Sequence, residues 1–535
     1  MNSEDIVKTL RLTSRLLELH DENPFKIKSL NNAVFKLDKT SIDLVNASME
    51  DLEKIEGIGK GIAQKIIEIQ KTGELPELKQ LLGITPAGVI DMLAIKGIGP
   101  KKVAQLWKEL NLESVGELLY ACHENRLVKL KGFGEKTQES VKKAIEFKLA
   151  NAGKFHYASV EDYAFKLIEE LKMKYPDSRI SLAGLIRRKC PVLEQIDILV
   201  SSSDTIELPL LQNAPTIPVK ITTCAEVDYA SLLFEKTANH EHLLLAGFAP
   251  AQFHSEEEIY TSLGMQYIEP ELREGRAEVE KARGKKIPDL IQLSDLKGIL
   301  HNHTTYSDGI NSVKEMAEYC KELGFGYLGI CDHSQSAFYA NGMKPETVLQ
   351  QHQEIDDLNK QLFPFRIFKG IESDILNDGS LDYEENILQS FDFIVASVHS
   401  NLKMDEEKAT ARLIKAIENP YTTILGHPTG RLLLYREGYR INHKKVIDAC
   451  AANNVVMELN AHPYRLDIDW TWIEYCISKG VKISINPDAH EKLGFHDMYY
   501  GICVARKGML YKEMCFNAMN CSEIETYLGK KNNKV

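Results

Sequence analysis

The stretch Leu300-His301-Asn302-His303-Thr304-Thr305-Tyr306-Ser307-Asp308-Gly309 follows directly on the short apolar run Gly298-Ile299. Side chains two residues apart on a β-strand point to the same face, so His301 and His303 can converge on one metal ion. Asp308 lies in the loop that follows and can fold back over the same ion. Two imidazoles and a carboxylate in this spacing predict metal ligands at the end of a strand.

The same arrangement, an apolar run that stops at a histidine or a carboxylate, recurs along the C-terminal part of the chain. Strands and helices alternate there, which predicts an α/β architecture with parallel strands. In barrels of parallel strands the reactive groups gather at the carboxyl ends of the strands. We therefore expect one metal centre formed by His301, His303, Asp308, His333, Glu372, His399, His427, Asp488 and His490. Asp332 is expected to orient its neighbours rather than to bind metal.

Six histidines and three carboxylates are too many ligands for one ion and suit two or three divalent ions. The set contains no thiolate, which favours Mn²⁺, Zn²⁺ or Fe²⁺. Such ions activate water for attack on a phosphorus atom. Arg431 follows His427 by four residues, and Arg465 follows His462 by three. Both arginines are candidate catalytic clamps for a phosphate, and each could instead pair with a surface carboxylate.

Residue by residue, the ligand set resembles that of the PHP (polymerase and histidinol phosphatase) family. The resemblance extends over essentially the whole of residues 296–535. It implies a distorted (β/α)7 barrel with a trinuclear metal centre, and no member of the ligand set is missing from this sequence.

The first 150 residues contain a Gly-x-Gly unit three times, at residues 55–60, 95–100 and 130–135, and an amphipathic helical stretch follows each. The paired glycines allow a tight turn with positive φ and leave backbone N–H groups at a helix N-terminus, where a phosphate can bind. The units resemble the helix-hairpin-helix motif, which implies contact with the DNA backbone that does not depend on base sequence. A purely structural turn between helices is the alternative. The glycines concerned are Gly57, Gly59, Gly97, Gly99, Gly132 and Gly134.

Residues 22–28 resemble the start of the small lyase-like domain of family X DNA polymerases. In that comparison Lys65 takes the position of the lysine that forms a Schiff base in members that remove a 5′ deoxyribose phosphate. An ordinary solvent-exposed lysine on a helix is the alternative interpretation. We expect residues 1–80 to form this lyase-like domain and residues 81–150 a fingers-like domain that carries the other two hairpins.

The middle of the chain resembles the palm of family X polymerases, which is a nucleotidyltransferase fold, but its site is degenerate. Gln195, Asp197 and Asp228 take the positions of three aspartates that hold two Mg²⁺ ions, and an amide cannot supply the charge that a hard cation needs. Gly184-Leu185 replaces the Gly-Ser turn that binds the triphosphate, and residues 237–240 replace the Thr-Gly-Ser part of the nucleotide pocket. Polymerase activity is therefore expected to be absent or impaired, with Mg²⁺ in the palm still possible.

Composition agrees with this division and excludes some classes of protein. Of the net charge of −12, residues 1–150 contribute +1 and the remainder −13. The acidic remainder suits a cation-collecting site, and the near-neutral N-terminal part leaves DNA contact open. The ten cysteines are scattered without a C-x-x-C pair, which favours a reducing cytoplasm over a disulfide scaffold. The N-terminus is acidic and polar, and no apolar run reaches about 18 residues, so neither a signal peptide nor a membrane span is expected.

In fold class we expect a multidomain protein: an all-α helix-hairpin-helix N-terminal region, an α+β palm and thumb at residues 151–275, a charged linker at 276–295 and the α/β barrel. As a whole the chain resembles the bacterial PolX proteins. The resemblance implies a DNA-repair enzyme with metal-dependent 3′–5′ exonuclease activity, and abasic-site or 3′-phosphate processing are further activities that it suggests. A gap-filling DNA polymerase, a phosphatase for small phosphomonoesters and a non-catalytic DNA-binding scaffold remain as alternatives.

Overall fold

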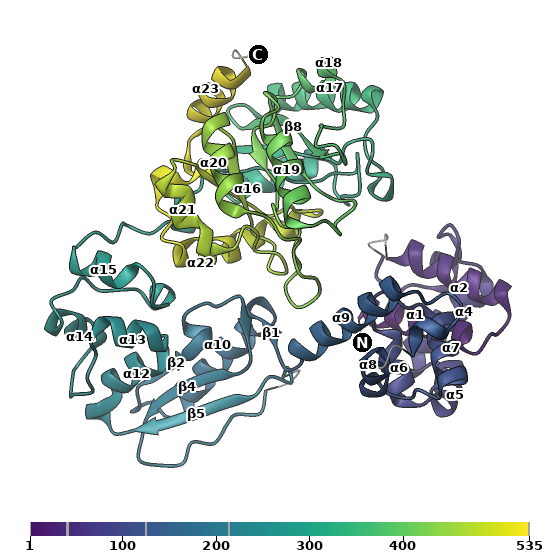
Figure 1. Ribbon diagram of the computed structural model, residues 1–535, viewed down its shortest axis with the longest axis horizontal. Helices are drawn as coiled ribbons and strands as arrows, with labels where there is room; N and C mark the ends of the chain where they lie inside the picture. The colour runs from purple at the N-terminus through teal and green to yellow at the C-terminus, as the bar shows by residue number, and fades with distance from the viewer. Residues whose placement is uncertain (1, 39–41, 124–125, 212–213, 533–535) are drawn as a thin grey trace. The chain divides into compact units, whose positions relative to one another are not determined.

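The computed structural model describes residues 2–38, 42–123, 126–211 and 214–532 (Figure 1). The chain forms two compact units, Met1–Ala152 and Gly153–Val535, and each contains its own apolar core. Within the described ranges, no helix combines the length and the apolar composition needed to cross a bilayer.

Among its described residues, the N-terminal unit contains helices and no strand, as the sequence predicts. Its first helix begins at a capping box between Asn2 and Asp5, and apolar residues on one face, such as Ile6 and Leu10, are fully buried. The α-helices of the unit are α1 (Ser3–Leu19), α2 (Pro24–Leu37), α3 (Met49–Glu53), α4 (Lys60–Thr72), α5 (Pro76–Ile84), α6 (Ala87–Leu93), α7 (Pro100–Leu110), α8 (Val115–His123) and α9 (Glu135–Ala150).

The palm at the start of the second unit is a small sheet with helices packed on it. Its strands are ordered β2-β4-β5, with β2 antiparallel and β5 parallel to β4. Two further short strands, β1 and β3, pair with each other. The elements are β1 (Phe155–His156), α10 (Tyr157–Lys174), β2 (Ile180–Ala183), α11 (Gly184–Arg187), β3 (Val192–Leu193), β4 (Ile196–Ser201), β5 (Val219–Cys224) and α12 (Tyr229–Thr237).

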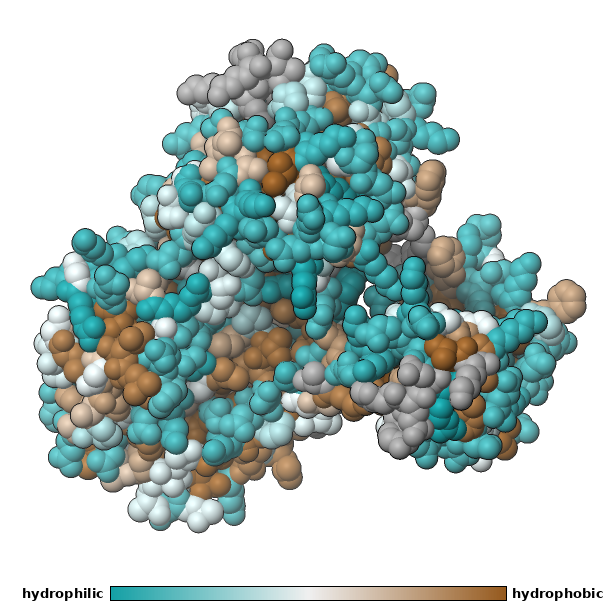
Figure 2. Space-filling view, viewed as in Figure 1, coloured by the Kyte–Doolittle hydropathy of each residue, from teal (hydrophilic) through white to brown (hydrophobic). Residues whose placement is uncertain are grey.

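The thumb consists of α13 (His240–Ala246), α14 (Glu256–Ser262) and α15 (Glu278–Arg283). Figure 2 shows hydrophobic residues gathered on its surface, where Leu244 of α13 is 62% exposed. The segment expected to be a linker, residues 276–295, contains α15 in its first half. There α15 buries Val279 in one apolar cluster with thumb residues. The many charged residues of this segment conceal the apolar spacing that buries one face of the helix.

The rest of the second unit is a barrel of seven parallel strands in sequential order, β6 to β12. A parallel bridge between Asn302 and Ala489 joins the two end strands, so the barrel is nearly closed. The predicted α/β barrel is confirmed. The strands are β6 (Gly298–Ile299), β7 (Tyr327–Ile330), β8 (Arg366–Asp374), β9 (Phe393–Ser397), β10 (Ile424–Leu425), β11 (Val456–Asn460) and β12 (Ile483–Asn486).

Helices cover the outside of this barrel, so its strands are buried on both faces, as their apolar runs predict. One difference from the sequence-based expectation bears on the site. β8 does not stop at Glu372 but continues to Asp374, which places a second carboxylate on the same face of the strand. The main covering helices are α16 (Val313–Glu322), α17 (Pro345–Leu362), α19 (Glu406–Ile417), α20 (His443–Asn453) and α22 (Met498–Lys507).

Candidate functional site

The carboxyl ends of the barrel strands bring all nine predicted metal ligands together. Eight of them form three overlapping groups, and within each group one nitrogen or oxygen atom per residue lies within 4.8 Å of the others. The ninth, His427, joins them through a hydrogen bond from Nε2 to Glu372 Oε1 of 3.0 Å. The groups are His303, Asp308, His333 and His490; His301, His303, Glu372 and Asp488; and His333, Glu372 and His399.

Glu372 lies at the middle of this arrangement and belongs to two of the groups. Its Oε1 is 3.3 Å from His301 Nε2 and 3.1 Å from His399 Nε2, whereas its Oε2 is 3.0 Å from His333 Nδ1. Burial alone would raise the pKa of Glu372, but the surrounding imidazoles, His399 and His301 foremost, hold that pKa well below its ordinary range. The carboxylate is therefore kept ionised at a position where it can bridge two cations.

Three of the candidate ligands, His301, His427 and Asp488, adopt backbone conformations with positive φ that a folded chain usually avoids. His301 has φ of 64° and Asp488 has φ of 53°, and residues other than glycine rarely occupy this left-handed region. Each lies just beyond the end of a strand, so the unusual φ turns its side chain toward the centre. Strain of this kind concentrates at functional sites.

The donor set fits divalent metal ions. Among the described residues, His301 Nε2, His303 Nδ1 and Glu372 Oε2 are buried and have no hydrogen-bond partner. His301 Nδ1 donates to Glu458 Oε1 at 2.6 Å, which leaves Nε2 with its lone pair directed at the centre. Buried lone pairs without a donor are costly, and a bound cation removes that cost. Imidazoles and carboxylates without a thiolate suit Mn²⁺, Zn²⁺ or Fe²⁺.

Two carboxylates that hold the ligands in place escaped the sequence analysis. Glu458, which is fully buried, accepts hydrogen bonds from His301 and from the backbone N–H of His427, the latter at 2.6 Å. Asp374 accepts a hydrogen bond from His399 Nδ1 at 2.5 Å. Glu458 lies inside β11, and Asp374 is the last residue of β8, two positions beyond Glu372. A charged residue within the apolar run of residues 455–459 is the signal that could have identified Glu458.

Asp332 belongs to none of the three groups. It is fully buried and accepts hydrogen bonds from the backbone N–H and hydroxyl of Thr304, from Ser307 Oγ and from Gln351 Nε2, at 2.5 to 2.7 Å. These bonds fix the loop that carries Asp308. Its surroundings are those of a residue that orients the loop, which is the role expected from the sequence.

The two candidate arginines occupy different positions. The guanidinium of Arg431 donates to the backbone oxygens of Arg465 and Leu466 and to Asp469 Oδ2, so its donors are used within the protein. Arg465 lies at the metal-binding groups, with Nε 3.7 Å from Asp488 Oδ2. Of the two arginines, the structure therefore brings only Arg465 to the centre. Arg431 instead holds the backbone of the loop that carries Arg465 and Leu466.

The palm positions do not form a comparable site. Gln195 Nε2 donates to Asp197 Oδ1 at 2.6 Å, and Lys220 stands beside Asp197 in the register of β4 and β5. The sequence analysis placed Asp197 and Asp228 at one site, but the structure keeps them apart. Asp228 is exposed and lies beyond the carboxyl end of β5, whereas Asp197 lies near the start of the parallel strand β4. Chain order suggested a pair that the strand register excludes.

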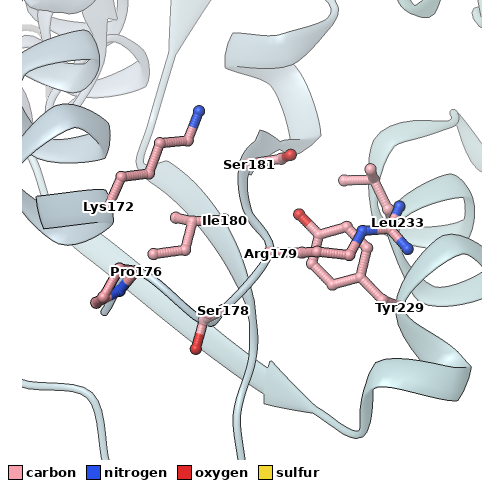
Figure 3. A pocket seen from close by; sticks show the side chains of 8 residues that line it. All are labelled: Lys172, Pro176, Ser178, Arg179, Ile180, Ser181, Tyr229 and Leu233. Carbon is pink, nitrogen blue, oxygen red and sulfur yellow. The ribbon is translucent and has the colours of Figure 1, made fainter. Parts of the chain in front are cut away.

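A separate palm pocket lies at the opposite end of β2 from Gly184. Figure 3 shows its eight lining residues, among them Lys172, Arg179 and Tyr229, and none of the eight is a carboxylate. The pocket has a volume of about 410 Å³. The Arg179 guanidinium lies over the Tyr229 ring, 4.3 Å from its centroid. Without a carboxylate, this pocket offers no ligand suited to Mg²⁺.

The three N-terminal hairpins share one backbone geometry. Gly57, Gly97 and Gly132 have φ of 90°, 97° and 86°, a region in which only glycine is at ease. The second glycine of each unit is the N-cap of the following helix, α4, α7 or α9, and no side chain caps any of the three. No atom lies within 4 Å of a Cβ built on the second glycines, Gly59, Gly99 and Gly134. Each helix N-terminus is thus unobstructed at its N-cap.

Lys65 lies on α4 and forms an ion pair with Glu77, which also pairs with Lys26. Burial tends to raise the pKa of Glu77, but the two ammonium groups lower it overall. The lysine is thus held by a carboxylate, and its side chain is 23% exposed. This placement suits an ordinary ion-paired lysine as well as a nucleophile, and the prediction stays open.

Comparison with known families divides the chain in the same way. Residues 1–75 match the helix-hairpin-helix domain and residues 89–146 the SAM-like helix-hairpin-helix tandem. Residues 233–274 match the DNA polymerase beta thumb, and residues 300–462 match the PHP domain. The predicted hairpins, thumb and metal-binding barrel therefore each correspond to a known family.

Individual relatives extend this picture to the full length. The DNA polymerase/3'-5' exonuclease PolX of Bacillus subtilis (strain 168) is 32% identical, over 99% of this chain and 100% of its own. Probable phosphatases of Acetivibrio thermocellus and Thermoanaerobacter sp. (strain X514) are each 27% identical, over 44% and 45% of this chain and 96% and 98% of theirs. Because hairpins, thumb and barrel follow one another as in a relative matched from end to end, this chain belongs to the PolX family.

Proposed function

We propose that this protein hydrolyses phosphodiester bonds of DNA at the barrel centre and removes nucleotides from the 3′ end. The observation that carries the proposal is the convergence of nine candidate ligands, among which His301, His303 and Glu372 each present a buried nitrogen or oxygen atom without a hydrogen-bond partner. The direction of degradation rests on the Bacillus subtilis relative, whose name states a 3'-5' exonuclease.

The three ligand groups suit two or three divalent ions, Mn²⁺, Zn²⁺ or Fe²⁺. When bound, such ions supply Lewis acidity toward water and toward the oxygens of a phosphate. Glu458 and Asp374 hold His301 and His399 in the tautomers that direct the remaining nitrogen inward. Arg465 is placed to bind a phosphate oxygen beside Asp488.

The N-terminal hairpins give this centre its nucleic-acid substrate. A helix N-terminus that presents unpaired N–H groups binds phosphate, and three such termini with identical N-cap geometry suit the repeating phosphates of a DNA strand. Contacts of this kind position DNA without reading its sequence. We propose that they hold DNA by its backbone while the barrel acts on the end.

The palm, in contrast, is proposed to lack polymerase activity. Phosphoryl transfer to a growing strand depends on two firmly held metal ions. Asp197 accepts a hydrogen bond from the side-chain amide of Gln195 and lies beside Lys220 in the register of β4 and β5. Asp228 lies past the opposite end of these two strands. One carboxylate next to an ammonium group cannot bind two Mg²⁺ ions.

The first test is the variant His303→Ala in the full-length protein. It should lose degradation of a 3′-extended, 5′-labelled oligonucleotide, because His303 belongs to two of the three ligand groups, and it should bind the same DNA as tightly as the wild type. His254→Ala, which changes an exposed histidine of the thumb region, is the matched control. Wild-type rates of degradation by His303→Ala would contradict the assignment.

A second test concerns the hairpins. Gly99→Ala places a methyl group where no atom lies within 4 Å, so the fold should persist while the methyl obstructs phosphate at the N-terminus of α7 and weakens DNA binding. Gly97→Ala, at φ of 97°, should instead lower the free energy of unfolding by roughly 1–2 kcal/mol. Fluorescence anisotropy with labelled DNA and thermal unfolding measure the two effects. Unchanged DNA affinity in Gly99→Ala would favour a purely structural turn.

A phosphatase for small phosphomonoesters is the second candidate, since two relatives are named probable phosphatases. Turnover of a labelled oligonucleotide and of a small sugar phosphate by the same preparation separates the two functions. Efficient hydrolysis of the sugar phosphate without degradation of DNA would favour the phosphatase.

A further inference from the structure

Two exposed tyrosines lie next to the metal-binding groups, on the loops that follow β10 and β11. Tyr435 is 60% and Tyr464 41% exposed, and their ring centroids are 5.8 Å apart. Tyr464 directly precedes Arg465, whose Nε is 3.7 Å from Asp488 Oδ2. The two rings therefore form an exposed aromatic surface beside the place where a phosphate would be cleaved.

The loops that carry these rings are fastened to each other. The backbone N–H of Leu433 donates to the carbonyl oxygen of Tyr464 at 2.7 Å. Arg431 Nε donates to the carbonyl oxygen of Arg465 at 2.9 Å. A surface that is fixed before the ligand arrives loses little conformational entropy on binding. The rings are thus prearranged as a platform.

A buried histidine from the palm packs against both tyrosine rings. His156, in β1, is 5% exposed and donates from Nε2 to the carbonyl oxygen of Leu433 at 2.9 Å. Its ring lies 4.4 Å from the Tyr464 ring and 5.5 Å from the Tyr435 ring, at interplanar angles of 38° and 25°. The palm therefore supplies a positioning residue for a surface at the mouth of the barrel.

We propose that Tyr435 and Tyr464, braced by His156, stack against the nucleobases nearest the scissile phosphate while Arg465 binds that phosphate. The inference rests on the proposed DNA hydrolysis and names the part of the substrate that is recognised. Every base presents a flat π-face, so stacking on aromatic side chains holds single-stranded DNA without selecting a sequence. A small phosphomonoester has no base, and for such a substrate the exposed rings have no role.

The test compares two single-stranded oligonucleotides that differ only at the 3′ end. One carries ordinary bases, and in the other the two terminal nucleotides are replaced by an abasic analogue. For the wild-type protein, KM for the base-bearing end should be lower by roughly tenfold, the size expected for one stacked base. The double variant Tyr435→Ala/Tyr464→Ala should remove the difference between the ends, whereas Tyr435→Phe/Tyr464→Phe should keep it.

Two further variants sharpen the result. His156→Ala should reduce the difference between the two ends, and His156→Gln, which can still donate to Leu433, should restore part of it. Phe363→Ala is the matched control, because this 82% exposed ring lies just before β8, at the opposite end of the barrel. It should leave the difference unchanged.

A binding measurement keeps the proposal testable if turnover is weak. In the His303→Ala background, 2-aminopurine at the 3′ end should be quenched on binding, and the two alanine substitutions should abolish the quenching. An unaltered tenfold difference or unaltered quenching in the alanine variants would overturn the platform and leave DNA hydrolysis standing. A wild-type protein that degrades neither oligonucleotide would overturn the proposed function itself.

Discussion

The palm and the barrel belong to one compact unit, and each presents a buried or half-buried carboxylate at a predicted metal site. In the barrel, Glu372 faces several imidazoles, and buried lone pairs around it lack a donor. In the palm, Asp197 accepts a hydrogen bond from the side-chain amide of Gln195 and lies beside Lys220 in the strand register. The barrel leaves negative charge and lone pairs for cations, whereas in the palm the carboxylate of Asp197 accepts a hydrogen bond from an amide and shares a small pocket with two lysines.

The palm and thumb retain structural connections to the barrel. Lys507 of α22 is buried and donates to the backbone oxygens of Arg188 and Glu271 at 3.0 and 3.1 Å, and it pairs with Glu274. Burying an ammonium group requires such complete satisfaction. Together with His156 beneath the aromatic platform, these contacts give the palm and thumb a supporting role that needs no metal.

The largest expected effect on DNA degradation comes from comparing one carboxylate substitution in the barrel with one in the palm. Glu372→Gln keeps the size of the side chain but removes the charge shared by two ligand groups, so degradation of single-stranded DNA should fall to background. Asp197→Asn should leave it unchanged. Rates on a 5′-labelled oligonucleotide with added Mn²⁺ measure both. Equal losses in the two variants would mean that the palm carboxylate still takes part in the chemistry.

A smaller loss of activity is expected when a residue that orients a metal ligand, rather than a ligand itself, is changed. Glu458 accepts hydrogen bonds from His301 and from the backbone of His427, and glutamine at this position offers only one acceptor oxygen. Loss of a partner that orients a metal ligand costs about 10–100-fold in metal affinity or activity. Glu458→Gln should therefore need more Mn²⁺ for half-maximal activity and recover at high Mn²⁺. Failure to recover would show that Glu458 does more than orient His301.

The two sites also differ in how far the sequence alone predicts them. Barrel ligands follow apolar runs, so local pattern and strand direction suffice to group His301 with residues as distant as Asp488. Glu458 lies within β11 and Asp374 ends β8 beyond Glu372. Their function depends on which imidazole stands opposite, and no local sequence pattern contains that information. The palm error has the same origin: Asp228 follows Asp197 in chain order, but the register of β4 and β5 places Lys220 there instead. Local chemistry is predictable, and pairing between strands is not.

The smallest effect is expected where a repair of the palm is attempted. Gln195→Asp restores one carboxylate, but Lys220 and Lys236 line the same small pocket as Asp197. The added carboxylate is therefore expected to form an ion pair with a lysine rather than to bind a metal ion. Primer extension on a gapped duplex with Mg²⁺ or Mn²⁺ should show no templated synthesis by this variant or by the wild type. The double variant Gln195→Asp/Lys220→Asp places three carboxylates together and should bind Mn²⁺ in the palm, measured by calorimetry in the Glu372→Gln background. Synthesis by the wild-type protein would show that Asp197 suffices and would remove the contrast between the two sites.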